Sequence, residues 1–248
     1  MKLGNPIAMG NTAKIFLYKN KIIKLFNDYL PDTESVYEAN KQSFAYSCGL
    51  SVPNVLDVTK INGKQAIIME YVEGKTLGEL LSENKEKLGY YMDLFVDSQR
   101  KIHLVKADSL EPMSEKLHRQ IQSAHILDQR YKSHLLKKLD EMTFEKRLCH
   151  GDFHPFNLII SGNDVTIIDW VDSSAGDVRA DVYRTYLLYS QFSMYLADMY
   201  LLLYCEKSGC SKDEIFQWAP IIAGARLSEG GTSEQAEQLL RIVKKDVM

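Results

Sequence analysis

Short apolar runs alternate with polar turns over the first third of the chain. Two such runs, Ala13–Tyr18 and Lys21–Phe26, are separated only by a Lys-Asn dipeptide. A second pair, Val55–Ile61 and residues 65–72, is separated by an Asn-Gly dipeptide and one further residue. Two-residue connections of this kind are typical of tight β-hairpins, and Asn-Gly is the strongest short signal for one. The pattern therefore predicts two antiparallel hairpins.

A helix is predicted between the two hairpins. Pro31-Asp32-Thr33 is a start signal, residues 34–48 are rich in helix formers, and Gly49 is a stop signal. The order strand, strand, helix, strand, strand describes a small antiparallel sheet with one helix.

Helical patterns dominate after Gly74. Thr76-Leu77-Gly78-Glu79 matches a capping box, in which the first and last side chains each bond the other's backbone N–H. A strand-loop-strand segment spans residues 147–170, and aromatic and apolar positions between Val182 and Tyr204 recur at near-helical spacing, which predicts core packing. Helices are predicted over residues 87–107, 114–127, 133–144 and from Asp181 onward. The fold class is therefore α+β, with a small sheet lobe over residues 1–73 and a mainly helical lobe over residues 74–248.

Charge and composition exclude several kinds of partner. The formal net charge is −3, and hydrophobic residues make up 45% of the chain, which is typical of a globular protein without a basic footprint for nucleic acid. The first six residues contain no apolar run, and residues 195–204, the most apolar stretch, include Asp198 and are too short to span a bilayer. None of the four cysteines forms a C-x-x-C pair. We expect a cytoplasmic protein with free thiols and neither a nucleic acid nor a membrane partner.

Three polar side chains within residues 150–170 have the chemistry that phosphoryl transfer requires. That reaction depends on positioning and on charge neutralisation. Asp152 can orient an attacking hydroxyl and accept its proton. Asn157 and Asp169 supply hard oxygen ligands of the kind that Mg²⁺ prefers. A polar turn over residues 161–164 would fold the second strand back and bring Asp169 near Asn157.

This segment resembles the aminoglycoside phosphotransferase/choline kinase family. The resemblance rests on His-Gly-Asp-Phe-His-Pro-Phe-Asn from His150, on Ile-Ile-Asp-Trp ending at Trp170, and on Gly176, Asp181 and Ile102-His103. It implies a two-lobed, protein-kinase-like fold and an ATP- and Mg²⁺-dependent transfer of phosphate to a hydroxyl of a small molecule. Residues 1–73 would then bind the nucleotide, and residues 74–248 would provide catalysis and bind the acceptor.

The resemblance also implies roles in the sheet lobe. Lys24 would hold the phosphates, paired with a helix glutamate. Glu38 is the preferred partner, and Glu34, one helical turn earlier, is the alternative. Main-chain groups around Glu70 and Val72 would bind the adenine.

Several departures separate the chain from protein kinases. Residues 9–13 lack the G-x-G-x-x-G of a phosphate-covering loop, which weakens only the assignment of that loop. Gly151 stands where protein kinases have arginine, Trp170-Val171 replaces Phe-Gly, and the stretch between Asp169 and Asp181 leaves little room for an activation loop. These differences favour a small-molecule kinase. The acceptor stays open among an aminoglycoside, an amino alcohol and a sugar-like alcohol, because residues 206–248 carry seven acidic and six basic side chains and so show no acidic bias.

Two alternative functions remain at this point. A nucleotide-binding module without turnover would keep the fold, but we expect it to lack one of Lys24, Asp152, Asn157 or Asp169, all of which are present. A metal-dependent hydrolase could use His150, Asp152 and His154, because alternate residues of a strand share one face.

Overall fold

The structure is a computed structural model that describes residues 3–247. The first two residues of the polar N-terminal stretch and residue 248 lie outside that range. The chain divides into two compact units: the first comprises residues 1–88 and 155–172, and the second comprises residues 89–154 and 173–248.

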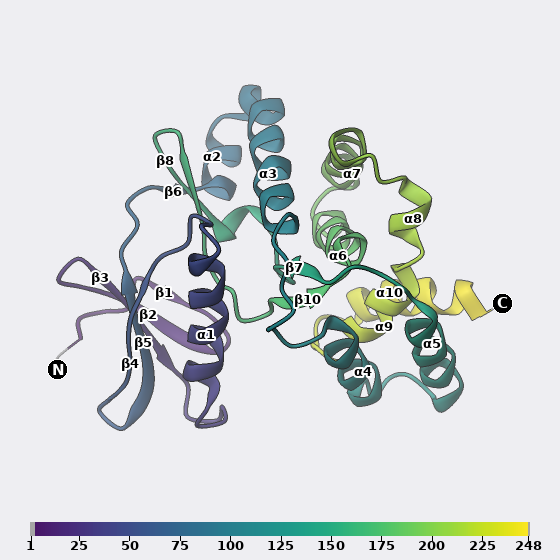
Figure 1. The fold of residues 1–248 in the computed structure, drawn as a ribbon, viewed down its shortest axis with the longest axis horizontal. Coiled ribbons are helices and arrows are strands. Elements are labelled where there is room, and N and C mark those ends of the chain that lie inside the picture. The colour runs from purple at the N-terminus through teal and green to yellow at the C-terminus, as the bar shows by residue number, and fades with distance from the viewer. Residues whose placement is uncertain (1–2, 248) are drawn as a thin grey trace. The chain divides into compact units, whose positions relative to one another are not determined.

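The first unit contains the predicted sheet with its helix (Figure 1). Its elements in chain order are β1 (Ala8–Met9), β2 (Ala13–Tyr18), β3 (Lys21–Phe26), α1 (Glu34–Ser47), β4 (Val55–Ile61), β5 (Lys64–Glu70), β6 (Lys75–Thr76), α2 (Leu77–Glu83), the 3-10 helices η1 (Lys85–Lys87) and η2 (Pro155–Asn157), β8 (Leu158–Ser161) and β9 (Asp164–Ile167). Five strands form an antiparallel sheet in the order β1-β2-β3-β5-β4, with α1 packed on β4 and β5.

Both hairpins have the turns that their sequences predict. Lys19 and Asn20 have φ angles of 48° and 59°, and Asn62 and Gly63 have 52° and 84°. Two consecutive positive φ angles match the right-handed twist of the strands on either side. The sheet buries apolar residues on both faces, because Phe26 and Ile67 belong to one core cluster and Ile23 and Ala66 to another.

A second, three-stranded sheet in the order β6-β8-β9 explains why the first unit extends past residue 73. Thr76 pairs with Ile159 and N-caps α2 through the predicted capping box with Glu79. Gly74 has a φ of 151°, and a side chain there would collide with the carbonyl of Ile160. The structural division thus differs from the predicted lobes by assigning residues 74–88 and 155–172 to the first unit. The functional roles given to the two lobes stay predictions.

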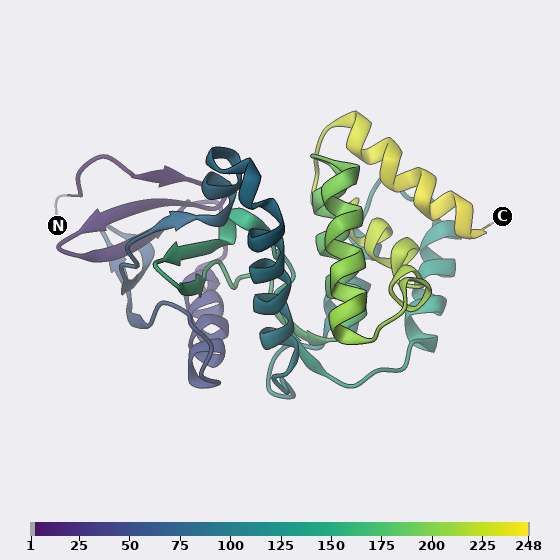
Figure 2. The same ribbon diagram turned by 90° about the horizontal axis from the view of Figure 1, so that it is seen from above.

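The second unit is mainly helical (Figure 2). Its elements are α3 (Leu88–His103), α4 (Met113–Ser123), α5 (Gln129–Glu141), β7 (Arg147–Cys149), β10 (Ser174–Gly176), α6 (Val178–Ser190), α7 (Met194–Ser208), α8 (Lys212–Phe216), α9 (Ala219–Arg226) and α10 (Ser233–Val247). β7 pairs with β10, and α9 packs against α4, α5, α6 and α10.

The aromatic spacing between residues 182 and 204 belongs to two helices. The first helix, α6, ends at Ser190, and the Ser193 hydroxyl then N-caps the second helix, α7. Tyr189 of α6 stacks on Tyr200 of α7 at 5.7 Å between ring centroids, and both rings are buried. Core packing is therefore what the spacing indicated. Within residues 3–247, no helix is both long enough and apolar enough to cross a membrane.

Candidate active site

A buried lysine lies at the centre of the first unit's polar site. Lys24 is in the middle of β3, where it pairs with Ile15 of β2 and Ile67 of β5. Its Nζ donates to Glu38 Oε1 at 2.6 Å and to Asp169 Oδ1 at 3.1 Å. Lys24 is only 8% exposed and Glu38 only 1% exposed. Three residues far apart in the sequence therefore meet at one ammonium group.

The two carboxylates of this group stabilise the positive charge of Lys24. Burial lowers the pKa of Lys24, but Glu38 and Asp169 raise it by more, so that the pKa lies above its ordinary value. An ion pair this well enclosed needs good geometry to offset desolvation, and the 2.6 Å contact provides it. Lys24 therefore stays charged at every physiological pH.

The helix partner of Lys24 is Glu38. Glu34, the alternative, lies in the first turn of α1, and its side chain is only partly buried. Lys41 of the same helix is also buried and donates to the carbonyl oxygen of Val171 at 2.7 Å. α1 is thus tied both to β3 and to the segment after Asp169. Sequence reasoning missed Lys41, because surface lysines on helices have the same local pattern.

Asn157 and Asp169 lie at the open end of one hairpin. β8 pairs with β9 through Leu158 and Ile167, and the backbone N–H of Ile168 donates to the Asn157 carbonyl at 2.9 Å. The predicted turn at residues 161–164 therefore brings the two predicted metal ligands to neighbouring positions. Asp169 has a φ of 64°, a left-handed conformation that is uncommon outside glycine. Such strained residues concentrate at functional sites.

A cavity of about 420 Å³ opens next to Lys24 in the first unit. Its lining combines apolar side chains with the charged group just described: Ile7, Ala8, Ile15, Ile22, Lys24, Glu38, Gln42, Pro53, Met69, Glu70, Tyr71, Val72, Gly74, Thr76, Glu79, Ile159, Ile168 and Asp169. Apolar walls with a few converging polar groups are typical of a small-molecule site.

Glu70 and Val72 line the same cavity. The Glu70 carboxylate accepts from the backbone N–H of Asn54 at 3.0 Å, and the Glu70 N–H donates to the Asn54 carbonyl at 3.0 Å, so Glu70 braces the neighbouring segment. Val72 lies between β5 and β6, and within residues 3–247 its backbone N–H donates to no backbone carbonyl. That N–H is suitable for binding the edge of a ligand.

Asp152 belongs to the second unit and lies between two basic side chains. Its Oδ2 is 3.4 Å from His154 Nε2, and its Oδ1 is 3.9 Å from an Nη of Arg184 on α6. The Asp152 side chain is 30% exposed. The carboxylate is therefore reachable by a ligand while its orientation is held from both sides.

The loop that carries Asp152 is anchored by a buried carboxylate. Asp181, in the first turn of α6, accepts the backbone N–H of Gly151 at 2.8 Å and that of His150 at 3.3 Å. His103 Nε2 lies 3.0 Å from the same carboxylate. Burial alone would raise the pKa of Asp181, but these donors lower it to about 2. Asp177, four residues earlier, is the N-cap of α6, so Asp181 anchors the loop and does not begin the helix.

Further residues hold this anchor from α3 and α7. His103 Nδ1 lies 2.7 Å from the hydroxyl of Tyr204, and Gln99 donates to Asp181 at 3.2 Å. Tyr200 donates to Gln99 at 2.5 Å. Sequence reasoning missed Gln99, Tyr200 and Tyr204 as parts of the site, because their spacing indicates only a buried helix face.

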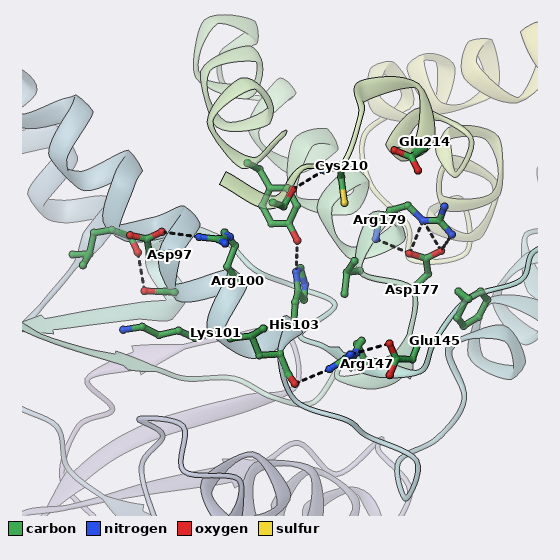
Figure 3. A pocket seen from close by; sticks show the side chains of 17 residues that line it. Asp97, Arg100, Lys101, His103, Glu145, Arg147, Asp177, Arg179, Cys210 and Glu214 are labelled. Atoms are coloured by element: carbon green, nitrogen blue, oxygen red, sulfur yellow. Dashed lines mark hydrogen bonds and ion pairs between the residues drawn. The ribbon is translucent and has the colours of Figure 1, made fainter. Parts of the chain in front are cut away.

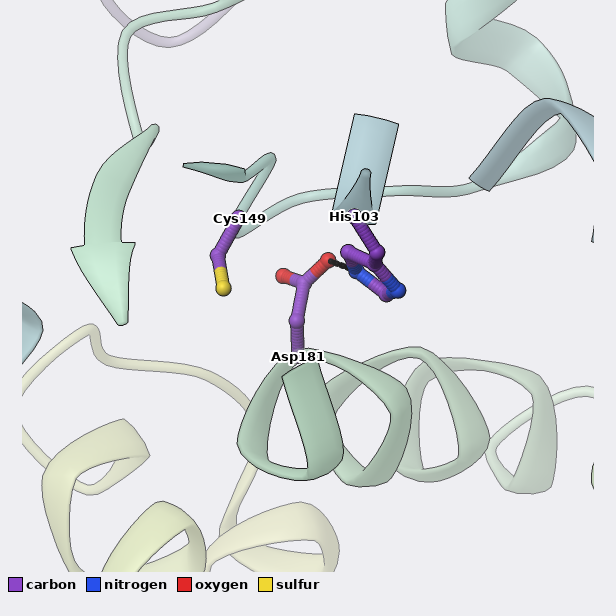
Figure 4. A group of neighbouring side chains, drawn as sticks. All are labelled: His103, Cys149 and Asp181. Carbon is purple, nitrogen blue, oxygen red and sulfur yellow. Dashed lines mark hydrogen bonds and ion pairs between the residues drawn. The ribbon is translucent and has the colours of Figure 1, made fainter. Parts of the chain in front are cut away.

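Cys149 lies beside this network. Figure 4 shows Asp181 between Cys149 and His103, and the possible ligand atoms of the three residues lie within 4.8 Å of one another. Burial raises the pKa of the Cys149 thiol well above its ordinary value, and the Asp181 carboxylate already accepts several hydrogen bonds. A metal would need a thiolate and would compete with the loop anchor. The cluster is therefore structural.

The histidine-aspartate metal site of the alternative hydrolase function is not formed. Within residues 3–247, only the group in Figure 4 brings three such ligand atoms within 4.8 Å, and His150, Asp152 and His154 do not. β7 ends at Cys149, and Gly151 has a φ of 81°, so these residues do not alternate as a strand would. The His150 ring instead accepts the backbone N–H of Asp152 at 3.3 Å.

A larger cavity of about 830 Å³ lies elsewhere in the second unit (Figure 3). Its charged side chains pair with one another: Arg179 with Asp177, Arg147 with Glu145, and Arg100 with Asp97. His103 and Tyr204 also line it. The balanced charges indicate no particular ligand.

A model of the phosphotransferase enzyme family matches residues 6–215. No curated protein matches the sequence. Similar solved structures include an aminoglycoside phosphotransferase, APH(4)-Ia, with ADP and hygromycin B (12% identity, TM-score 0.72, covering 97% of this chain and 92% of that one). A choline kinase from Cryptosporidium parvum Iowa II is also similar (13% identity, TM-score 0.66, covering 98% and 88%).

A third similar structure is the amicoumacin kinase hAmiN in complex with AMP-PNP, Ca²⁺ and Ami (13% identity, TM-score 0.63, covering 97% of this chain and 86% of that one). At these identities the likeness establishes the fold, which confirms the predicted kinase-like α+β class. The family match spans most of the sequence, including Lys24, Asp152 and Asp169. The chain therefore belongs to the phosphotransferase enzyme family and is a small-molecule kinase.

Proposed function

We propose that the protein transfers the terminal phosphoryl group of ATP to a hydroxyl of a small molecule in a Mg²⁺-dependent reaction. The observation that carries this proposal is the meeting of Lys24, Glu38 and Asp169 at the edge of an apolar-walled cavity. A lysine that served only to pair with two carboxylates would not have to line a cavity. The combination of apolar walls and a charged end suits a ligand with an apolar ring at one end and anionic phosphates at the other.

The residues present suit a nucleotide. Ile15, Ile22 and Ile168 line the cavity and can sandwich a flat base, while the Val72 N–H supplies a main-chain donor for its edge. The Lys24 ammonium would bind phosphate oxygens at the charged end. The similar structures that contain ADP and AMP-PNP support this assignment.

The residues present also suit a hard cation. Asp169 offers a carboxylate that is 41% exposed, on the same cavity as Lys24, and Asn157 lies beside it across the hairpin end. Carboxylate and amide oxygens plus phosphate oxygens are the ligands that Mg²⁺ takes in kinases. When bound, the cation would neutralise charge on the phosphates.

Asp152 would act on the acceptor. Its carboxylate would accept a hydrogen bond from the acceptor hydroxyl, align that oxygen for attack, and take its proton as the new phosphorus–oxygen bond forms. Gly151 and Asp181 hold the backbone of this loop, so the carboxylate needs little reorganisation before the reaction. Removal of the group should therefore slow the transfer much more than it weakens nucleotide binding.

The acceptor is a small alcohol of the aminoglycoside, amino alcohol or sugar-like type. The similar structures include enzymes whose names specify an aminoglycoside and choline, which supports this range without narrowing it.

The proposal is tested by an ATP-consumption screen over such alcohols, with ³¹P NMR to detect the phosphate ester. We expect ADP and ester to form in equal amounts, only with Mg²⁺, and not with Asp152→Asn. ATP binding without ester formation over the whole panel would instead favour a nucleotide-binding module.

A further inference from the structure

Lys41 is the second buried lysine of the first unit, and it contacts the segment that carries Asp169. It lies on α1 three residues after Glu38, so the two side chains share one face of the helix. Lys41 is only 3% exposed, and its Nζ donates to the carbonyl oxygen of Val171 at 2.7 Å. The same helix face therefore reaches the Asp169 segment twice, from Glu38 through Lys24 and from Lys41 through Val171.

The position of the Lys41 ammonium is fixed by its contacts. The Nζ lies 4.1 Å from the centroid of the Tyr37 ring, which adds a cation–π contact to the bond with Val171. Removing an ammonium from water is costly, and an apolar side chain of the same length would fill this space without that cost. A lysine here therefore indicates that the main chain at Val171 has to be held in one place.

The backbone next to Val171 is the part of the site that most needs support. Asp169 has a φ of 64°, and a residue in this conformation keeps it only where the surrounding structure holds the chain on both sides. Before Asp169, the Ile168 N–H donates across the end of the β8–β9 hairpin at 2.9 Å. After it, Trp170 is fully buried and Lys41 holds the Val171 carbonyl. Lys41 thus supports the left-handed residue from its C-terminal side.

We propose that Lys41 is a positioning residue for the cation site: its bond to Val171 holds the backbone that turns the Asp169 carboxylate toward the nucleotide cavity. This inference rests on the proposed function, in which Asp169 would hold Mg²⁺, and adds a residue to it. Asp169 and Lys24 are among the described residues that line the cavity and Lys41 is not, so Lys41 acts through Asp169. Without Lys41 the segment should populate other conformations, and the apparent affinity for the cation should fall in proportion.

Calorimetric titration of AMP-PNP into Lys41→Met, with and without Mg²⁺, tests the inference. Methionine keeps the length of the side chain and removes the ammonium. We expect the affinity without Mg²⁺ to stay within about twofold of the wild type, and the gain in affinity on adding Mg²⁺ to be about tenfold smaller, the effect of one hydrogen bond to a charged group. Lys60→Met, at an exposed lysine of β4 in the same unit, is the matched control and should keep the full gain.

A purely structural role for Lys41 gives a different result. In that case Lys41→Met lowers the Tm of the ligand-free protein but keeps the full Mg²⁺-dependent gain, and this outcome overturns the inference. Amide hydrogen exchange gives a second readout: residues 168–172 should exchange faster in the variant, while the β2–β3 hairpin should not change. Equal exchange of residues 168–172 in the two proteins would also overturn it. Should Lys41→Met fail to fold, Lys41→Gln, with a shorter and neutral side chain, is measured in its place, and the same loss is expected.

The failure of the inference and the failure of the proposed function are distinguishable in the same titrations. If Mg²⁺ strengthens nucleotide binding equally in the wild type and in Lys41→Met, the role of Lys41 is wrong and the nucleotide site stands. If the wild type binds no nucleotide, or gains nothing from Mg²⁺, the proposed function is wrong and the inference falls with it.

Discussion

The left-handed backbone of Asp169 aims its carboxylate at Lys24. At a φ of 64° an aspartate is tolerated, because its short polar side chain suits this conformation better than most. Asparagine tolerates it equally, so Asp169→Asn removes the charge without new backbone strain, whereas alanine would add strain. Asparagine is also the suitable replacement at Asp152, because it keeps the shape of a side chain whose Oδ2 lies 3.4 Å from His154 Nε2.

Asp152→Asn should lower kcat by about 10²–10⁴-fold, because the acceptor loses its proton acceptor. This corresponds to about 3–5 kcal/mol of barrier. The KM for ATP should stay within about twofold, since Asp152 lies outside the unit that lines the nucleotide cavity. Steady-state kinetics measure both. Asp108→Asn, at an exposed position of the same unit, is the control, and full turnover of the Asp152 variant would defeat the assignment.

Glu38 and Glu34 form a natural comparison on one helix face. Glu38→Gln should raise the KM for ATP by about tenfold, since Lys24 would lose its closest charged partner at 2.6 Å. Glu34→Gln should change it little, because the Lys24 ammonium donates to Glu38 and Asp169, and Glu34 is less buried than Glu38. Equal effects of the two substitutions would contradict the pairing.

At the scale of elements, α6 organises the loop that carries Asp152. Asp177 begins the helix as its N-cap, and Asp181, one turn later, accepts the loop's backbone N–H groups. Its folded pKa of about 2 lies below the ordinary value of 3.8. A carboxyl with a lowered folded pKa stabilises the protein above its unfolded pKa, and this stabilisation is lost as the pH falls through the folded value.

Asp181 should therefore contribute about 2 kcal/mol to the free energy of unfolding at neutral pH, and this contribution should fade between about pH 4 and pH 2. Asp181→Asn should be less stable at pH 7 by that amount or more, and its stability should fall less steeply in acid. Urea unfolding at several pH values measures this. Parallel curves for wild type and variant would contradict the anchoring role.

Strands that are joined by a short turn could be predicted from the sequence. Short strands that form only by pairing with a distant segment could not. β2 and β3 begin and end where the alternating pattern predicts, because the Lys19-Asn20 turn is encoded in place. β6 and β10 were missed, since each is a few residues long and forms only by pairing with β8 or β7. The predicted helix over residues 87–107 ends earlier, at His103, whose ring is committed to Asp181.

The candidate site, too, has parts that could be predicted from the sequence and parts that could not. Glu38 pairs with Lys24, as the resemblance implied, and the hairpin of β8 and β9 brings Asn157 next to Asp169, as the turn indicated. One strand, one helix and one hairpin suffice to place these residues. The Asp181 network could not be predicted, because it needs α3, α6 and α7 to be packed first. No local pattern distinguishes Arg184 from a surface arginine.

At the scale of the whole molecule, each compact unit holds one half of the proposed chemistry. The first unit carries the cavity with Lys24 and Asp169, and the second carries Asp152. Ligand binding to the folded state raises stability by mass action, by about 2.7 kcal/mol at a hundredfold excess over Kd. For a chain of 248 residues, this predicts that ATP with Mg²⁺ raises Tm by about 5–10 °C.

Differential scanning fluorimetry measures that rise. Asp152→Asn should show the same shift as the wild type, because the first unit alone lines the nucleotide cavity. A shift that requires Asp152, or one that appears equally without Mg²⁺, would be inconsistent with the assigned roles.

The most direct test of the account is calorimetric titration of ATP into the wild-type protein and into Asp169→Asn, each with and without Mg²⁺. We predict that the wild type binds ATP at least about tenfold more tightly with Mg²⁺ than without it, and that the variant shows no such gain. Equal Mg²⁺-dependent affinity in the two proteins, or no ATP binding by the wild type, would contradict the nucleotide site built around Lys24, Glu38 and Asp169.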